Sequence, residues 1–361
     1  MRIIVKEYFY AFFTFLIKGY NVSSIRRKHM QDFLIEMLEC PSCHGELNWK
    51  ITQHQGDRIE EAEVNCKKCG STYPVKEGIA LFLTPDLPRN DLWEQLDSQL
   101  IKYLRENPQI ESKLMDAPLN TLNSADQFFR AQILEERGEF AQAKATANLA
   151  YSKLYAPEYL KCNNAQINYI IAQLSIFDGP IIDLASGRGD LAELFIRKLK
   201  QPIVFTDFSP QILRRNHRWL DFFGLYDRVS LLAFDARRSP FKDGAIKVMT
   251  TNLGLINIEE PENLLIELKR IISEKFFIIS QFYSEDDEVN AEAIKKIGLG
   301  KFLFRNSALE SFRAAGWQVK MENMMIGKAC PTPKGEVIEE ASIDAFPITE
   351  TKLEWGVLAA Q

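Results

Sequence analysis

Four cysteines stand in two closely spaced pairs, a pattern typical of metal ligands. Cys40 and Cys43 form one C-x2-C pair, Cys66 and Cys69 form the other, and 22 residues separate the two pairs. Two such pairs bring four thiolates to the corners of a tetrahedron, which is the coordination that structural zinc prefers. The spacing therefore predicts a closed zinc site with these four cysteines as its ligands.

Two alternatives to this zinc site remain open from the residues alone. His44, beside the first pair, is a conceivable substitute ligand, although four cysteines already fill a tetrahedral site. Disulfide bonds are the other alternative, but a chain of 361 residues with six cysteines and no clear secretory signal favours a reducing compartment. We therefore expect a cytoplasmic protein with reduced thiols. Cys162 and Cys330 are isolated and are expected to be ordinary buried residues.

A second set of residues places three carboxylates at the ends of apolar segments. Asp183 ends a short β-branched segment, Asp207 follows 24 positions later and Asp235 another 28 positions later. A turn of small residues, 185–189, follows Asp183 and leads into a helical pattern. Open α/β sheets bind ligands at the carboxyl ends of their strands, and small residues let the backbone approach a ligand closely. These residues predict a ligand site at that edge, facing the N-terminus of a helix.

In this arrangement residues 155–361 resemble the class I S-adenosylmethionine-dependent methyltransferases. The resemblance implies that S-adenosylmethionine is the cofactor and that the small-residue turn faces its methionine and ribose part. It further implies that Asp207 holds the ribose hydroxyls and that Asp235 contacts the adenine amino group. The cofactor-binding residues expected on this basis are Asp183, Ala185, Ser186, Gly187, Gly189, Asp207, Phe208, Asp235, Ala236 and Asn252.

Two other interpretations of the turn are possible from its residues. A phosphate-binding dinucleotide fold is disfavoured, because Ala185, Arg188 and Asp190 break the G-x-G-x-x-G spacing. A Rossmann-like domain that binds nothing is the remaining alternative. Ala185 itself departs from the resemblance, because the family usually has glycine at that position.

The elements that must position these residues alternate as a parallel sheet requires. The pattern predicts an α/β fold with a seven-stranded Rossmann-like sheet. The first expected strand ends at 183, and the other six span 202–206, 229–234, 245–251, 276–280, 318–324 and 354–359. Helices are expected at 262–273 and 307–316.

The segment after the second cysteine pair carries another resemblance. Tyr73-Pro74-Val75 is followed by Gly78-Ile79 and a short apolar strand. This order resembles the small zinc-ribbon activator subunit of tRNA, rRNA and protein methyltransferases over residues 37–84. The resemblance implies a small β zinc ribbon fused to a catalytic domain, and it does not transfer a substrate.

Charge limits the kinds of partner. Residues 31–90 contain ten acids and six bases, and the whole chain has a formal net charge of −5. Such a balance argues against a long DNA footprint, but it leaves a compact RNA or a protein substrate open. Arg214, Arg215 and Arg218 could form a basic patch with Arg237 and Arg238, although a solvated helix face is the expected role for most of them.

The chain divides into four expected parts. Residues 1–29 form a doubtful extension, which is either a mistranslated leader before a true start at Met30 or an interfacial anchor. Their apolar stretch is too short to span a bilayer, so we expect no stable membrane span. The zinc ribbon is expected at 30–85, a helical connector or lid at 86–160 with helices 91–107, 124–137 and 140–154, and the methyltransferase domain at 161–361.

The resemblance also implies a reaction. Methyl transfer is an in-line displacement, so the protein mainly aligns donor and acceptor. Asn252 and Tyr283 follow the fourth and fifth expected strands, and we assign both to orientation of the acceptor. The acceptor is unidentified and is RNA, protein or a small molecule. The alternative from another class is a non-catalytic cofactor-binding scaffold or activator that acts through its zinc ribbon.

Overall fold

Seven strands form the α/β part of the molecule, and four more come from the N-terminal segment. The computed structural model describes residues 30–361 apart from 56–57, 85, 88–90, 92–99 and 340. The seven strands are β5 (Ile181–Asp183), β6 (Ile203–Asp207), β7 (Val229–Phe234), β8 (Ile246–Asn252), β9 (Ile272–Phe282), β10 (Val319–Ala329) and β11 (Thr351–Ala360). The four are β1 (Leu47–Gln55), β2 (Arg58–Cys66), β3 (Thr72–Lys76) and β4 (Ile79–Phe82).

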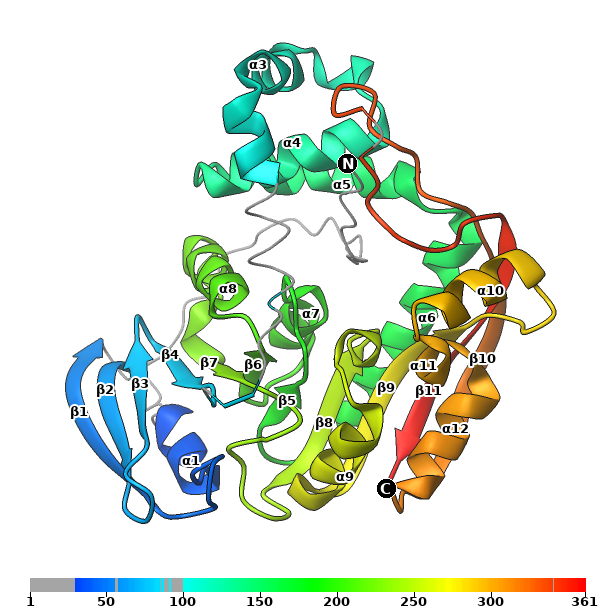
Figure 1. Ribbon diagram of the computed structural model, residues 1–361. Helices are drawn as coiled ribbons and strands as arrows, with labels where there is room; N and C mark the ends of the chain where they lie inside the picture. The colour runs from blue at the N-terminus through cyan, green and yellow to red at the C-terminus, as the bar shows by residue number, and fades with distance from the viewer. Residues whose placement is uncertain (1–29, 56–57, 85, 88–90, 92–99, 340) are drawn as a thin grey trace.

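All these strands belong to one sheet with the order β1-β2-β3-β4-β7-β6-β5-β8-β9-β11-β10 (Figure 1). Strands β5 to β9 pair in parallel, whereas β11 and β10 pair antiparallel at one end. The chain steps outward from β5 to β6 and β7 and then returns to the other side of β5 at β8. The point where the strand order reverses, at which open α/β sheets bind ligands, therefore lies between β5 and β8.

The ribbon strands extend this sheet. Strand β4 pairs in parallel with β7, with Ile79 opposite Leu231 and Phe82 opposite Phe234. The predicted α/β fold is confirmed, but the predicted total of seven strands is wrong, because β1–β4 raise the count within the described residues to eleven. The physical reason is that β7 would otherwise expose an unpaired edge, which the ribbon covers.

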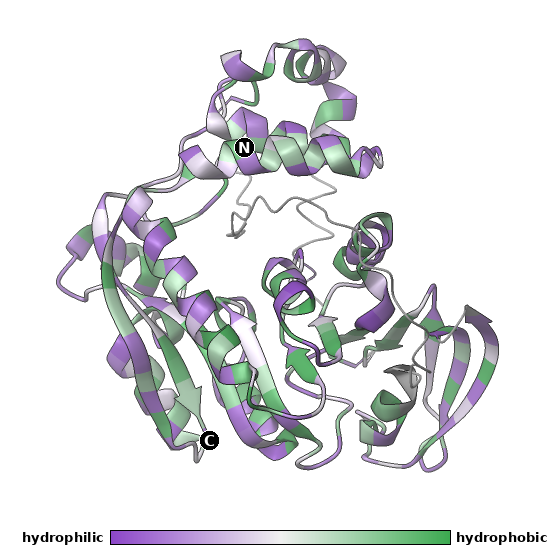
Figure 2. Ribbon diagram, turned by 180° about the vertical axis from the view of Figure 1, so that it is seen from behind, coloured by the Kyte–Doolittle hydropathy of each residue, from purple (hydrophilic) through white to green (hydrophobic). Residues whose placement is uncertain are grey.

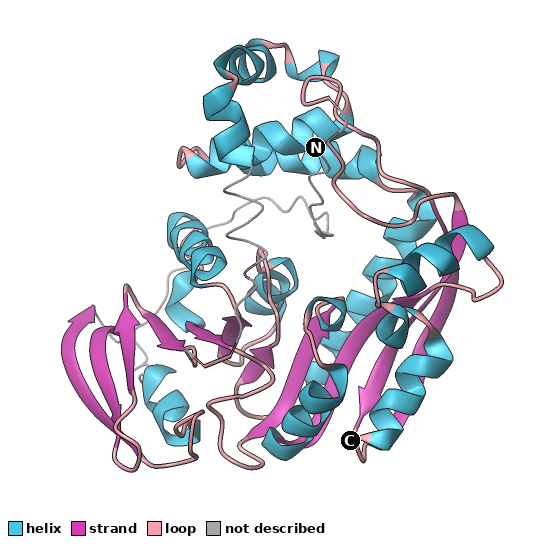
Figure 3. Ribbon diagram, in the orientation of Figure 1, coloured by secondary structure: helices cyan, strands magenta, loops and turns pink. Residues whose placement is uncertain are grey.

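Helices cover both faces of the sheet (Figure 3). On one face, α6 (Pro157–Leu174), α7 (Asp190–Lys198) and α8 (Pro210–Phe222) pack against one apolar core. On the other face lie α1 (Met30–Met37), α9 (Pro261–Ile271) and α12 (Arg305–Ala314). The shorter elements are α10 (Glu288–Lys296), α11 (Gly300–Leu303) and the 3₁₀ turns Leu119–Thr121, Tyr226–Arg228 and Leu255–Asn257.

The sheet's centre is apolar because its strands are buried on both faces. Every residue of β6 and β7 is buried, which is typical of parallel strands covered by helices. Figure 2 shows the same pattern, with hydrophobic residues along the central strands and hydrophilic ones on the outer helix faces. Proline at the first turn starts α6, α8 and α9, where its missing N–H costs nothing.

A group of helices lies beyond the carboxyl ends of the parallel strands (Figure 1). This group, called the cap here, contains α3 (Pro108–Asp116), α4 (Ser124–Glu136) and α5 (Phe140–Leu154). Residues 100–106 are also helical, while most of the helix expected at 91–107 lies outside the described residues. Five aromatic residues between α4 and the start of α6 are buried, in agreement with a packing role: Phe128, Phe129, Tyr151, Tyr155 and Tyr159.

The cap also contacts a segment from the C-terminal part of the chain. The connection between β10 and β11 reaches α4, where Asp126 accepts hydrogen bonds from the N–H groups of Glu336 (2.9 Å) and Val337 (3.0 Å). Helix α6 runs through residue 160, where the expected boundary between connector and methyltransferase domain lies. The expected boundary therefore falls inside a helix rather than in a linker.

The expectations for residues 1–29 lie outside the described part of the chain. None of the helices that the structure describes combines the length and apolar character needed to cross a membrane.

Candidate functional site

The turn between β5 and α7 holds three residues with positive φ angles. They are Ala185 (51°), Gly187 (52°) and Gly189 (82°). Gly189 cannot carry a side chain, because a Cβ there would lie 2.4 Å from Cε2 of Phe205. The turn therefore presents bare backbone, and the N-terminus of α7, at the carboxyl edge of the sheet. Ser186 anchors it by donating from Oγ to the carbonyl of Asp183 (2.8 Å).

Ala185 is the strained member of this turn. Its φ of 51° lies in the left-handed region, which costs an L-residue about 1–2 kcal/mol relative to glycine. Its methyl group is accommodated because Gly254, in the loop after β8, has no side chain. A Cβ on Gly254 would lie 2.9 Å from the Cβ of Ala185.

Ala185→Gly is therefore expected to stabilise the fold by about 0.5–1 kcal/mol, because relief of the left-handed strain outweighs the added freedom of the unfolded chain. Urea unfolding would measure the change. Ala293→Gly, inside α10, is the control of opposite sign and should destabilise by about 1 kcal/mol. A lower urea midpoint for Ala185→Gly would contradict the strain argument.

Asp207 ends β6, next to the turn. Its carboxylate is 8% exposed and accepts hydrogen bonds from the N–H of Gly187 (3.0 Å) and of Ser209 (3.0 Å). Burial raises the pKa of Asp207 to about 6 by removing water from the charged form, although these N–H groups favour that form. A buried carboxylate is thus held in place by the turn itself.

Asp183 is the second buried carboxyl of this edge. Burial raises its pKa to about 7, the hydrogen bonds from Ser186 and Thr250 lower it, and the nearby charge of Asp207 raises it further. Thr250 Oγ1 donates to Asp183 Oδ1 at 2.9 Å. Asp183 therefore ties β5 to β8, the two strands that flank the topological switch point.

Asp235 lies just beyond β7 and is 4% exposed. Its carboxylate accepts hydrogen bonds from Nε (3.0 Å) and Nη2 (2.7 Å) of Arg237. Arg237 also pairs with Glu260 (2.7 Å). An adenine amino group would therefore share the Asp235 oxygens with Arg237. Of the two neighbouring residues predicted to contact the cofactor, Ala236 is buried and Phe208 is half-buried.

Asn252 ends β8 beside Ile279 of β9. Its side-chain Oδ1 is buried, and no described residue donates a hydrogen bond to it. A buried acceptor without a donor is costly, so this atom is suited to a donor supplied by a ligand. Leu253, the next residue, has a φ of 55°, which is rare for a branched side chain and is typical of functional loops.

Tyr283 follows β9 and is packed more tightly than Asn252. It is 4% exposed, and its ring meets that of Phe346 edge to face with centroids 6.1 Å apart. Its N–H donates to the carbonyl of Leu303 (2.9 Å). The structure thus builds Tyr283 into the core between β9 and the β10–β11 connection.

The four cysteines meet at a second site. Their Sγ atoms all lie within 4.8 Å of one another. Cys40 and Cys69 Sγ are 3.6 Å apart, and Cys43 and Cys66 Sγ are 3.5 Å apart. A tetrahedral zinc ion with Zn–S bonds of about 2.3 Å separates its sulfurs by about 3.8 Å. The cluster therefore has nearly the dimensions of a zinc–tetrathiolate site.

The surroundings of the cluster suit thiolate ligands. The N–H groups of Lys68 (3.3 Å) and Cys69 (3.4 Å) donate to Cys66 Sγ. Gly45 lets its backbone pass close to the cluster, because a Cβ there would lie only 2.9 Å from Cys66 Sγ. Tyr73 Oη lies 3.3 Å from Cys40 Sγ, so the tyrosine of the Tyr-Pro-Val segment forms a hydrogen bond with one of the four cysteines.

Two family models match separate parts of this chain. A model described as Trm112p-like protein matches residues 31–78, which include all four cysteines. A model described as methyltransferase domain matches residues 181–275, which include the turn, Asp207 and Asn252. The chain combines a Trm112p-like domain with a methyltransferase domain.

Individual relatives cover only part of the chain. It is 32% identical over 107 residues to the ubiquinone/menaquinone biosynthesis C-methyltransferase of Cupriavidus metallidurans, covering 29% of this chain and 43% of that protein. It is 35% identical over 94 residues to the demethylmenaquinone methyltransferase of Streptomyces avermitilis, covering 25% of this chain and 36% of that protein. The chain thus spans less than half the length of these curated relatives.

Solved structures show more distant similarity. A putative methyltransferase from Bacillus halodurans is 16% identical with a TM-score of 0.42, covering 53% of this chain and 96% of that one. The geranyl diphosphate C-methyltransferase of Streptomyces coelicolor is 14% identical with a TM-score of 0.41, covering 55% of this chain and 80% of that one.

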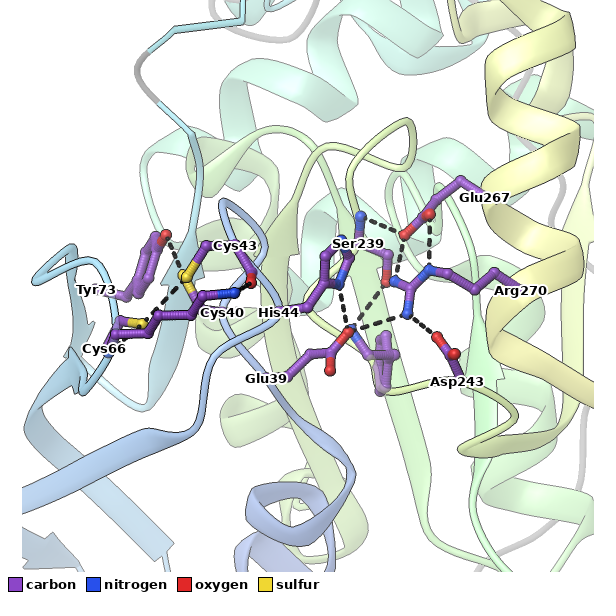
Figure 4. A network of polar contacts seen from close by, with 12 residues as sticks. Glu39, Cys40, Cys43, His44, Cys66, Tyr73, Ser239, Asp243, Glu267 and Arg270 are labelled. Atoms are coloured by element: carbon purple, nitrogen blue, oxygen red, sulfur yellow. Dashed lines mark hydrogen bonds and ion pairs between the residues drawn. The ribbon is translucent and has the colours of Figure 1, made fainter.

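The Trm112p-like domain docks on the methyltransferase domain through a polar network beside the cysteines (Figure 4). Glu39 pairs with Arg270 of α9 (3.0 Å), and Arg270 also pairs with Glu267 (2.7 Å) and Asp243 (2.6 Å). His44 donates from Nδ1 to Oε1 of Glu39 (2.6 Å), so its side chain is directed away from the cysteines. The alternative of His44 as a metal ligand therefore has no support in the geometry.

The arginines near the turn after β5 are neutralised by acids. Arg215 is buried, the side chain of Arg237 is 8% exposed, and Arg214, Arg218 and Arg238 are more exposed. Each has a carboxylate partner within 4.0 Å, so these five side chains form no free basic patch. Sequence reasoning missed the partner of Arg215, which is Glu135 in the cap. The available signal was that Glu135 lies seven and four positions after Phe128 and Ala131, which places it on the same helix face.

Proposed function

We propose that this protein is an S-adenosylmethionine-dependent methyltransferase whose cofactor lies on the turn after β5. The observation that supports it best is that the positive-φ turn contacts the buried Asp207 carboxylate, which accepts a 3.0 Å hydrogen bond from the N–H of Gly187. In this proposal Asp207 accepts the ribose hydroxyls. Asp183, Ala185, Ser186, Gly187, Gly189, Phe208, Asp235, Ala236 and Asn252 line the remainder of the cofactor site.

The cofactor supplies an activated methyl group on a sulfonium sulfur, so the chain's own residues need only hold and align the reactants. The orphaned Oδ1 of Asn252 would accept a hydrogen bond from the acceptor and orient it at the end of β8. Tyr283 is the second residue that we propose to orient the methyl acceptor. Because its ring is buried, it would act by packing beside the site. The cap would exclude water from this end of the sheet.

The zinc in this proposal is structural, because four thiolates leave no open coordination position. We assign the zinc ribbon to residues 30–85, the connector to 86–160 and the methyltransferase domain to 161–361. We place the protein in the cytoplasm, where its thiols stay reduced.

The acceptor is the unassigned part of this function. RNA, protein and small molecules remain the classes to test. A quinone-like ring is one small molecule that we propose to include, because two relatives are named for ubiquinone/menaquinone biosynthesis and for demethylmenaquinone methylation. A non-catalytic scaffold that binds the cofactor and acts on a partner is the competing function.

Turnover distinguishes these functions. The purified protein would be incubated with methyl-labelled S-adenosylmethionine and fractions of cell extract, and formation of S-adenosylhomocysteine would be measured. Fractions treated with nuclease or with protease would identify the acceptor class by loss of label. Cofactor binding without turnover in any fraction would favour the scaffold.

The raised pKa of Asp207 leads to a prediction about pH. Only the ionised carboxylate can accept both ribose hydroxyls, so protonation should weaken binding. Because the pKa is about 6, affinity for S-adenosylhomocysteine should be constant above pH 7 and fall about tenfold per unit below pH 6. Calorimetry from pH 5 to 8 would measure this. Asp207→Asn should lose this fall below pH 6, and any dependence that remains near pH 7 would belong to Asp183. An unchanged acid limb in that variant would reject the assignment.

A further inference from the structure

The cap inserts one carboxylate between two arginines that belong to the methyltransferase domain. Glu135, in the last turn of α4, pairs with Arg188 through Oε2 and with Arg215 through Oε1. The three side chains are 4%, 9% and 5% exposed, respectively. Charges at this depth interact strongly because little water screens them.

Both arginines are part of the support of the turn after β5. Arg188 is a residue of that turn, between Gly187 and Gly189. Arg215, on α8, donates from Nη1 to the carbonyl of Arg188 (2.6 Å). Its neighbour Asn216 donates from Nδ2 to the carbonyl of Gly187 (2.8 Å). Two successive carbonyls of the turn are thus held by α8, and Glu135 holds the guanidinium groups above them.

The cap meets the same helices at a second point. Lys144 of α5 pairs with Glu193 of α7 (2.9 Å), and Trp219 of α8 donates from Nε1 to the same carboxylate (2.9 Å). Cap, turn and the helices on either side of the turn are therefore linked by charged contacts, buried at Glu135 and partly exposed at Lys144. Movement of α4 away from α8 would withdraw the Glu135 carboxylate from two buried guanidinium groups, which is unfavourable.

We infer that Glu135 is a positioning residue for the cofactor turn, so that the cap completes the cofactor site. This inference rests on the proposed function. Because coupling between two sites is reciprocal, a turn that is ordered by Glu135 must also stabilise the cap when the cofactor binds.

Two measurements test this on the full-length protein, with S-adenosylhomocysteine as the probe. In calorimetry, Glu135→Gln should weaken binding about tenfold, while zinc content and far-ultraviolet circular dichroism stay unchanged. Glu136→Gln is the matched control: it is the next residue of α4, 43% exposed and 3.8 Å from an exposed Arg218. Its affinity should match that of the wild type.

Hydrogen exchange separates positioning from mere stability. In the wild type the probe should slow exchange in residues 124–136 about fivefold or more. Arg188→Met should abolish this protection, and it keeps the Glu135–Arg215 pair, so it can fold even where Glu135→Gln cannot. Equal probe affinity in Glu135→Gln and wild type, or undiminished protection in Arg188→Met, would overturn the inference alone. A wild type that does not bind the probe would overturn the proposed function and the inference together.

Discussion

Replacing Cys66 and Cys69 together with serine is expected to abolish zinc binding and to unfold the Trm112p-like domain. All four Sγ atoms lie within 4.8 Å of one another, so the loss of two ligands leaves no tetrahedral site. Structural zinc contributes about 10–16 kcal/mol to the folding of small domains, which far exceeds what the ribbon's short strands can supply. The wild type should carry about one zinc ion per chain and the variant none.

The effect should extend into the methyltransferase domain. Strand β4 covers the edge of β7, and Tyr73 and Phe82 share an apolar core with Phe234 and Phe241. Unfolding the ribbon would expose that edge and part of that core, so the variant should aggregate. Elemental analysis, limited proteolysis and sedimentation velocity would measure zinc, ribbon folding and aggregation.

Cys330→Ser is the control for loss of a thiol, because Cys330 lies outside the cluster, in the β10–β11 connection. It should keep its zinc and stay monodisperse to the same degree as the wild type. Retention of zinc by the Cys66→Ser/Cys69→Ser variant would refute the proposed ligand set.

Asp207→Ala is expected to weaken the binding of S-adenosylhomocysteine about ten- to a hundredfold. Hydrogen bonds to a charged group in a partly dry site contribute about 1.5–3 kcal/mol. Asp207 is 8% exposed and is oriented by the N–H groups of Gly187 and Ser209, so no other described carboxylate replaces it at the end of β6. Calorimetry on protein with unchanged zinc content would measure the loss.

Asp221→Ala is the matched control, because Asp221 lies on the exposed side of α8. Its affinity should equal that of the wild type. An Asp207→Ala variant that is folded and binds with wild-type affinity would remove the ribose assignment, and with it the main support for the proposed cofactor site.

Much of the candidate site was predictable because its signals are local. The two C-x2-C pairs predict a tetrahedral cluster from spacing alone, since each pair folds as one tight turn around its sulfurs. The acids at 183 and 207 end adjacent parallel strands, so any sheet built from these segments brings them to one edge. The positive φ angles at Gly187 and Gly189 likewise follow from residue type.

Other features depend on pairs of residues that are far apart in the chain. Strand β4 joins β7 through the pairing of Ile79 with Leu231, and no local pattern indicates which edge a short apolar strand will cover. The ribbon was therefore expected as a separate unit before a sheet of seven strands. Asp235 reads as a free ligand for a cofactor, yet its oxygens are already occupied by Arg237.

The sequence by itself determined the chemistry of the zinc cluster and the edge of the sheet where a cofactor would bind. Only the tertiary structure decided that Glu135 of the cap lies between Arg188 and Arg215, 53 and 80 positions away in the chain. Charged residues on helices usually face water, and periodicity alone cannot reveal which of them are buried in pairs. The three charges can be buried only when α4 packs against α8, because the Glu135 carboxylate then neutralises Arg188 and Arg215 on other elements.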